Sequence, residues 1–332
     1  MTAQQLDVIG FGNAIVDVIS RAEEAFLDRH DMRKGGMTLI DEARAEAVYA
    51  AMGPGVEISG GSAANTMVGV AALGGRSGFA GKVRDDELGG IFAHDIRAAG
   101  VAYATPPAAS GPATARCLIL VTPDGERTMN TFLGAAQDLS PADVDEAMVT
   151  SAAVTYLEGY LWDPPAAKEA FLKAAGIAHK AGRTVALTLS DAFCVGRYRA
   201  EFLDLIRNGT VDLVFANEAE LSSLYETGFD EALARLRTDA RRAVVTRSEK
   251  GALCVAGEEI VTVSAFPVVR VVDTTGAGDL FAAGFLHGFA RGFTAEESLK
   301  LGALAASEII GHIGARPERK LKEFALEHGL RV

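Results

Sequence analysis

From about residue 150 onward, short apolar runs rich in β-branched residues alternate with segments whose apolar residues recur at helical spacing. The apolar runs have the length of buried strands. They cover residues 153–157, 184–189, 211–215 and 243–246, and the helical segments cover residues 165–181, 199–208, 218–226 and 230–237. Because such alternation places parallel strands between two layers of helices, this part of the chain predicts a doubly wound α/β sheet.

The N-terminal part of the chain combines two patterns. Residues 6–10 and 62–73 predict a strand and a helix of the same α/β layers, whereas residues 14–45 and 99–133 break the rhythm. The strand patterns in these two stretches cover residues 15–20, 36–40, 113–121 and 125–131, with a Thr-Pro-Asp-Gly turn at 122–125. We therefore predict that the two stretches form a small β-sheet lid, which covers one end of the main domain and excludes water. The large domain then comprises residues 1–13, 46–98 and 134–332.

The composition excludes several classes of protein. With 332 residues, of which 49% are hydrophobic and 23% charged, the chain can bury a large core and is not disordered. Its net charge of −12 argues against nucleic acid or an anionic membrane as a partner. The N-terminus lacks a signal-peptide pattern, and no apolar run approaches the ~20 residues that span a bilayer, so we expect a cytoplasmic protein. The cysteines and histidines show no metal-type spacing.

The 36 glycines exceed the typical share of about 7%, and several of them cluster. The most informative cluster is Gly276-Ala277-Gly278-Asp279, which follows a strand-like run at 270–272 and precedes a helix with phenylalanines at every fourth position. These small residues leave the first N–H groups of the helix uncovered at the positive end of its dipole. We therefore predict an anion hole formed by Gly276, Ala277 and Gly278.

A carboxylate beside an anion-binding site is electrostatically unfavourable unless it has a chemical role. Asp279 fits the role of a base that removes the proton from a hydroxyl group as that group attacks a phosphoryl group. The alternative is a helix start at which the glycines allow close packing and Asp279 caps the helix.

A second cluster reads Ser59-Gly60-Gly61-Ser62-Ala63-Ala64-Asn65. Its glycines let a ligand approach the backbone, and Ser62 is expected to cap the helix that follows. Asn65 offers both a donor and an acceptor, which suits a pair of sugar hydroxyls. The alternative is an ordinary Gly-Gly turn followed by a cap.

The third cluster, at residues 10–17, is not a dinucleotide fingerprint, because Ile15 stands where the third glycine is required. Asn13 and Asp17 are interpreted instead as groups that hold substrate hydroxyls. A Walker A loop is also absent, since the nearest match, ending in Lys82, has five intervening residues and no Ser or Thr after the lysine.

Two weaker signals lie where strands of the large domain are expected to end, which is where open α/β sheets bind ligands. Asn217 can face a phosphate, and Glu220 can hold Mg²⁺ through water; the alternative is a capped helix start. Residues 244–251 end another strand in a polar turn, for which the alternative is a surface loop.

Residues 273–279, together with Gly60, Gly61 and Asn65, resemble the two signatures of the ribokinase-like (PfkB) kinases, and the resemblance extends from residue 10 to 317. It implies a doubly wound α/β domain with a β-sheet lid, and transfer of a phosphoryl group from ATP to a primary hydroxyl. It also implies Asp279 as the base and Mg²⁺ as the cofactor, and it leaves K⁺ open as a further ion. The residues that it implies for nucleotide and metal binding are Asn217, Glu220, Thr246, Arg247, Gly251, Thr275 and Ala303.

Within that family, Asn13, Asp17 and residues 156–160 look most like adenosine kinases. This likeness implies that Arg127 contacts phosphate. It also implies an apolar slot for a purine base, formed by Met37, Leu39, Leu133 and Phe193.

The resulting hypothesis is 5′-phosphorylation of a nucleoside, adenosine above all, with Asn13, Asp17, Gly61 and Asn65 around the ribose. Two alternatives stay open. One is a sugar kinase of the same family that acts on ribose, fructose or a 2-keto-3-deoxy acid, and the other is a non-catalytic regulator that binds a nucleoside or sugar. The sequence leaves a monomer and a homodimer equally open.

Overall fold

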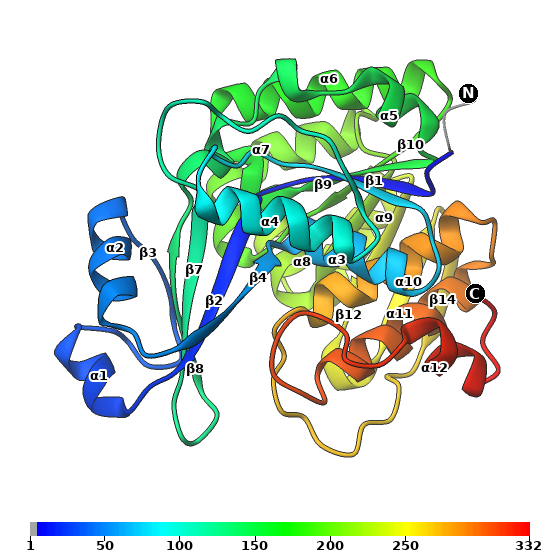
Figure 1. The fold of residues 1–332 in the computed structure, drawn as a ribbon. Coiled ribbons are helices and arrows are strands. Elements are labelled where there is room, and N and C mark those ends of the chain that lie inside the picture. Colours follow the sequence, from blue (N-terminus) through cyan, green and yellow to red (C-terminus); the bar gives the residue numbers. More distant parts are fainter. Residues whose placement is uncertain (1–4) are drawn as a thin grey trace.

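The computed structural model describes residues 5–332 and contains two β-sheets (Figure 1). Residues 1–4, assigned above to the large domain, lie outside the described residues. The large sheet has the order β14-β13-β12-β11-β10-β9-β1-β5-β6, parallel from β12 to β6 and antiparallel at the β12-β13-β14 edge. Its strands are β1 Val8–Phe11, β5 Ser77–Ala80, β6 Ala102–Tyr103, β9 Val154–Glu158, β10 Thr184–Thr188, β11 Leu213–Asn217, β12 Arg242–Thr246, β13 Ala252–Ala256 and β14 Glu259–Val263. The doubly wound α/β class predicted from the sequence is confirmed.

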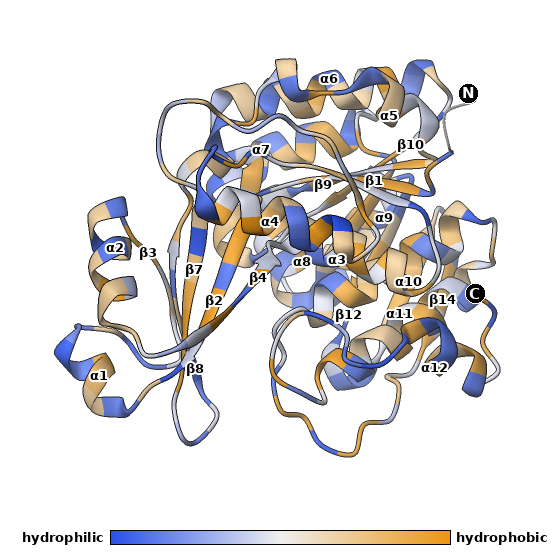
Figure 2. Cartoon of the chain, in the orientation of Figure 1, coloured by the Kyte–Doolittle hydropathy of each residue, from blue (hydrophilic) through white to orange (hydrophobic). Residues whose placement is uncertain are grey.

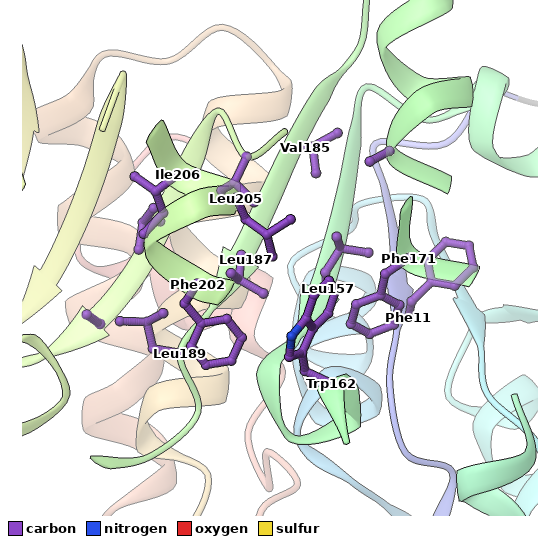
Figure 3. Packing of buried hydrophobic residues seen from close by; sticks show 14 of the residues in the cluster. Phe11, Leu157, Trp162, Phe171, Val185, Leu187, Leu189, Phe202, Leu205 and Ile206 are labelled. Carbon is purple, nitrogen blue, oxygen red and sulfur yellow. The ribbon is translucent and has the colours of Figure 1, made fainter. Parts of the chain in front are cut away.

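Helices cover both faces of the large sheet, because alternate strand residues point to opposite sides and both sides are apolar. One face is covered by α5 Glu146–Ser151, α6 Pro165–Lys180, α7 Ala192–Arg207, α8 Glu218–Tyr225 and α9 Phe229–Asp239. Figure 3 shows part of that core, in which Phe11 and Leu157 of the sheet lie near Phe171 of α6. The other face is covered by α3 Ser62–Ala72, α4 Glu87–Ala98, α10 Ala277–Ala290 and α11 Ala295–Ile309, with α12 Leu321–Glu327 against α3 and α11.

The small sheet has the order β3-β8-β7-β2-β4. Its strands are β2 Ile15–Arg21, β3 Met37–Leu39, β4 Gly55–Gly60, β7 Ala115–Val121 and β8 Arg127–Phe132. On one face, Val16, Val18 and Leu118 pack toward α1 Glu24–Arg29 and α2 Glu42–Ala51. In Figure 2 the strands β2 and β7 are mainly orange, whereas α1 and α2 carry blue, hydrophilic segments. The opposite face of the small sheet carries Ile119 and is turned toward the large domain.

The structure corrects four details of the sequence-based expectations. It places β4 in the small sheet and β6 in the large one, opposite to the boundaries drawn above, because β4 pairs with β2 and β6 pairs with β5. Helix α7 begins earlier than expected because Asp191 caps it, accepting a hydrogen bond from Cys194 N at 2.6 Å. Residues 270–272 form no strand. The N–H of Val272 donates instead to the Ile310 carbonyl at 2.8 Å, and no strand lies beside this segment among the described residues.

The fold brings the carboxyl ends of the parallel strands opposite the small sheet. Strands β9, β10, β11 and β12 end there at residues 158, 188, 217 and 246, all of which border one cleft. Within residues 5–332, none of the helices has both the length and the apolar character that crossing a membrane requires.

Candidate active site

A cleft of about 970 Å³ lies between the large domain and the inner face of the small sheet. Most residues singled out from the sequence border it. They are Asn13, Asp17, Met37, Leu39, Gly61, Ser62, Asn65, Leu133, Phe193, Asn217, Glu220, Thr246, Thr275, Gly276, Gly278 and Asp279. Residues far apart in the chain therefore meet in one place. Gly60, Ala277, Arg127, Arg247, Gly251 and Ala303 are not part of this lining.

The start of α10 forms one wall of the cleft. Gly276 is its N-cap, with φ of 78°, a conformation that L side chains rarely adopt. The N–H of Ala277 donates to the Thr274 carbonyl at 3.2 Å, whereas those of Gly278 and Asp279 have no acceptor within the described part of the chain. A Cβ built at Gly278 meets no other heavy atom within 4 Å, so this side of the helix end is open. The geometry is that of an anion-binding helix terminus.

The Asp279 carboxylate is held by two donors from α3. Its Oδ1 accepts from Ser62 Oγ at 2.6 Å and its Oδ2 from Asn65 Nδ2 at 3.0 Å. Burial raises the pKa of Asp279, while these two hydrogen bonds and the nearby Arg316 guanidinium act to lower it. Asp279 does not cap α10, and Ser62 does not cap α3, where Gly61 is the N-cap. The two side chains are instead hydrogen-bonded to each other, and both border the cleft.

Asp17 on β2 lies beside the Gly60-Gly61 turn. A Cβ at Gly60 would lie 2.4 Å from Asp17 Oδ2, so glycine is needed there for the carboxylate to fit. Gly61 has φ of 96°, and a Cβ on it would lie 2.1 Å from the Asn13 carbonyl oxygen. Burial raises the pKa of Asp17 to about 6, against the opposing charges of Arg316 and Arg127. The paired glycines thus let Asp17 and Asn13 pack closely beside the cleft.

Sequence reasoning missed two ionisable groups here, the buried Glu158 in the cleft lining and the partly buried Arg316 outside that lining. Glu158, at the end of β9, accepts from Asn13 Nδ2 and Ala63 N, both at 2.8 Å, and burial raises its pKa to about 7. The available signal was a carboxylate directly after a predicted buried strand. Arg316 donates from Nε to the Ser59 carbonyl at 3.0 Å. Burial lowers the pKa of Arg316 to about 10, and no local pattern marked this residue.

Part of the cleft lining forms an apolar wall. Met37, Leu39 and Phe193 are 50%, 51% and 70% exposed, although a large apolar side chain is normally covered. Ile119 and Met129 of the small sheet extend the same wall and were not among the predicted residues. Exposed apolar side chains gathered in a cleft are typical of a ligand site.

Asn217 and Glu220 form a capping box at the start of α8. Glu220 N donates to Asn217 Oδ1 at 2.9 Å, and Asn217 N donates to Glu220 Oε2 at 3.0 Å. Burial raises the pKa of Glu220 to about 7. Within residues 5–332, no group of three or more His, Cys, Asp or Glu side chains is arranged to hold a metal ion. Mg²⁺ commonly takes only one or two protein carboxylates and completes its shell with waters and substrate phosphates.

The remaining predicted residues lie around the cleft. Arg247 Nε donates to Glu218 at 2.7 Å, and its guanidinium lies 4.2 Å from the centre of the Phe229 ring. Gly251 closes the turn that follows, with φ of 88°, and Ala303 is buried in α11. Arg127 on β8 forms an ion pair with Asp273, just before the anion-binding turn.

Residues 40–321 match the model of the pfkB family of carbohydrate kinases. The chain belongs to the pfkB family. As a pfkB protein it is a phosphotransferase whose acceptor is an alcohol group. Gly276, Gly278 and Asp279 border the cleft of this kinase fold.

The pfkB relatives are named for different acceptors. An adenosine kinase of Sinorhizobium meliloti is 56% identical, with 98% of this chain and 100% of that chain covered and a TM-score of 0.91. A probable sugar kinase from Rhizobium etli CFN 42 is 55% identical over 100% of both chains, with a TM-score of 0.92. Fructokinase-1 of Oryza sativa subsp. japonica is 30% identical over 241 residues, which is 70% of this chain and 74% of the rice protein.

Proposed function

We propose that this pfkB protein transfers the γ-phosphoryl group of ATP to the 5′-hydroxyl of a nucleoside, with adenosine as the substrate and AMP as the product. The observation that carries the choice of acceptor is the set of apolar side chains that borders the cleft together with the hydroxyl-binding residues. A purine base attached to a ribose fills that space, whereas a free sugar leaves it exposed to water.

The wall is suited to a flat aromatic group. Ile119, Met129 and Leu133 come from or directly follow the small sheet, and Phe193 comes from the first turn of α7. Covering such side chains with a base stabilises the complex by about 25 cal/mol for each Å² of apolar surface removed from water. Asn13, Asp17 and Asn65 border the same cleft and are expected to hold the ribose hydroxyls.

Asp279 is the proposed base. It removes the proton from the attacking hydroxyl, which must displace the Ser62 hydroxyl or the Asn65 amide from one carboxylate oxygen or share that oxygen with it. The free N–H groups of Gly278 and Asp279 are expected to donate to the transferring phosphoryl group. This differs from the anion hole of Gly276, Ala277 and Gly278 expected from the sequence, because the Ala277 N–H is already engaged by the Thr274 carbonyl. Arg127 is placed by its ion pair with Asp273 at the edge of this turn, from where it can add positive charge.

The nucleotide is expected along Asn217, Thr246 and Thr275, with Glu220 holding Mg²⁺ through water. Mg²⁺ neutralises the charge that develops on the phosphate oxygens. The proposal leaves K⁺ activation and the choice between monomer and homodimer open to measurement. A cytoplasmic location remains an expectation from the sequence.

A sugar kinase is the second candidate, favoured by the fructokinase and the probable sugar kinase among the relatives. The hydroxyl-binding end of the cleft suits any vicinal diol. The two candidates differ only in what covers the apolar side chains of the cleft, which is a base for a nucleoside and water for a free sugar.

The deciding experiment is ADP release from ATP and Mg²⁺ with adenosine, inosine, guanosine, ribose and fructose as acceptors. We expect the highest kcat/KM with adenosine. Turnover of fructose or ribose without turnover of nucleosides would refute the nucleoside proposal. Thermal stabilisation by adenosine without ADP release in any arm would instead favour a binding protein.

A further inference from the structure

Two asparagines in the cleft show the same unusual hydrogen bonding. The amide oxygens Oδ1 of Asn13 and Asn65 are buried and have no partner among the described residues. Their amide nitrogens are both engaged by carboxylates, because Asn13 Nδ2 donates to Glu158 at 2.8 Å and Asn65 Nδ2 donates to Asp279 at 3.0 Å. A buried acceptor without a partner is costly, so both oxygens need a donor from a ligand.

The carboxylate partners determine which way each amide points. An asparagine amide can be turned by 180° to exchange its donor and its acceptor. An ionised carboxylate accepts hydrogen bonds only, so it forces the NH₂ group of Asn13 toward Glu158 and the oxygen away from it. Glu158 is 1% exposed and accepts two further bonds, from Asn13 N at 3.3 Å and Ala63 N at 2.8 Å.

The backbone that follows β1 packs closely against Glu158. A Cβ built at Gly12 would lie 2.2 Å from Glu158 Oε2 and 2.7 Å from Ala63 Cβ. Any other residue at position 12 would therefore displace the carboxylate. This packing explains why a glycine precedes Asn13, although residues 10–17 do not form a dinucleotide-binding motif.

We propose that Glu158 is a positioning residue that orients the Asn13 amide, so that this wall of the cleft offers hydrogen-bond acceptors to substrate hydroxyls and rejects deoxy substrates. The acceptors are Asn13 Oδ1, Asn65 Oδ1 and the Asp17 carboxylate. A substrate that lacks the matching hydroxyl leaves a buried acceptor unpaired, and sites of this kind discriminate strongly. Glu158 also borders the cleft, but Asn13 and Ala63 engage its carboxylate oxygens, and it acts on the substrate through Asn13. This inference rests on the proposed nucleoside kinase activity.

The variant Glu158→Gln tests the orientation directly. The substituted side chain keeps the volume but replaces one acceptor oxygen by an NH₂ donor. Either Ala63 N then loses its acceptor, or both Asn13 N and Asn13 Nδ2 lose theirs, because the two Asn13 donors share Oε1. When that NH₂ faces Asn13, the amide of Asn13 turns and presents a donor to the substrate. We expect the preference for a hydroxylated over a deoxy acceptor to fall about 10-fold or more.

The readout is the ratio of kcat/KM for adenosine to kcat/KM for 2′-deoxyadenosine and for 3′-deoxyadenosine, measured at about pH 8, where Glu158 is ionised. This ratio is independent of the fraction of folded enzyme, so a loss of stability alone does not change it. Glu169→Gln on the exposed face of α6 is the matched control and keeps the wild-type ratio. In an Asn13→Ala background, Glu158→Gln is expected to change the ratio no further, because the two residues act in series.

The outcomes separate the two proposals. An unchanged ratio in Glu158→Gln, or equal use of all three acceptors by the wild type, overturns the positioning role and leaves the nucleoside kinase standing. If the wild type phosphorylates no nucleoside, the proposed function fails. The same variants are then compared with ribose and 2-deoxyribose, where an unchanged ratio again overturns the role of Glu158.

Discussion

Gly278→Ala is expected to make the protein slightly more stable and much less active. A Cβ built at Gly278 meets no heavy atom within 4 Å beyond its chain neighbours and the adjacent backbone of its own helix, so the added methyl group enters the cleft without a clash. Gly278 lies in the first turn of α10, and Ala is favoured over Gly in helices by up to about 1 kcal/mol. For a chain of this length, that corresponds to a rise in Tm of about 2 °C or less.

The same methyl group occupies the space next to the free N–H groups of Gly278 and Asp279. Loss of one oxyanion-type donor typically costs about 10²- to 10³-fold in kcat, and we expect a loss of this size. The measurements are Tm by differential scanning fluorimetry and kcat by coupled ADP release.

Gly176→Ala is the matched control. Gly176 is an exposed residue within α6 and also has no heavy atom within 4 Å of an added Cβ. It gains the same helix propensity, far from the cleft, so activity is expected to stay at the wild-type level. Wild-type kcat in Gly278→Ala would refute the anion-hole assignment, and a joint loss of stability and activity would contradict the open space beside Gly278.

Three further outcomes are expected. Asp279→Asn lowers kcat by about 10²- to 10⁴-fold in the ADP-release assay; near wild-type kcat removes Asp279 as the base. The pKa of Glu158 is raised to about 7 in the folded protein, so Glu158 ionises at lower pH in the unfolded chain than in the folded one. Its contribution to the unfolding free energy therefore falls as pH rises from about 4.5 to 7. In Glu158→Gln, the unfolding free energy is therefore expected to change less between about pH 5 and about pH 7.5 than in the wild type, as measured by urea denaturation. An equal change in both proteins would contradict this expectation. Arg127→Met leaves Asp273 buried without its partner and lowers Tm by several degrees; adding Asp273→Asn recovers part of that loss, and no recovery would contradict a direct pairing.

The sequence predicted the features that depend on local order along the chain. Strand and helix periodicity is a property of neighbouring residues, so the main α/β layers, including β9 to β12, were placed correctly. The Gly276-Ala277-Gly278-Asp279 turn could also be predicted, because glycine at a helix start acts through its own backbone. Local pattern failed at residues 270–272, where β-branched residues suggested a strand but no neighbouring strand is available among the described residues.

Only the tertiary structure decided which distant residues meet. Asp279 and Ser62 are 217 positions apart in the chain, and Asn13 and Glu158 are 145 apart, yet each pair is joined by a short hydrogen bond. Nothing in a single sequence marks such partners, because hydrogen bonding depends on distance in space. The same limit hid Arg316 and the pairing of β4 with β2. The proposed base is therefore identified by one short motif, whereas the orientation of the groups that are expected to hold the substrate is set by the packing around it.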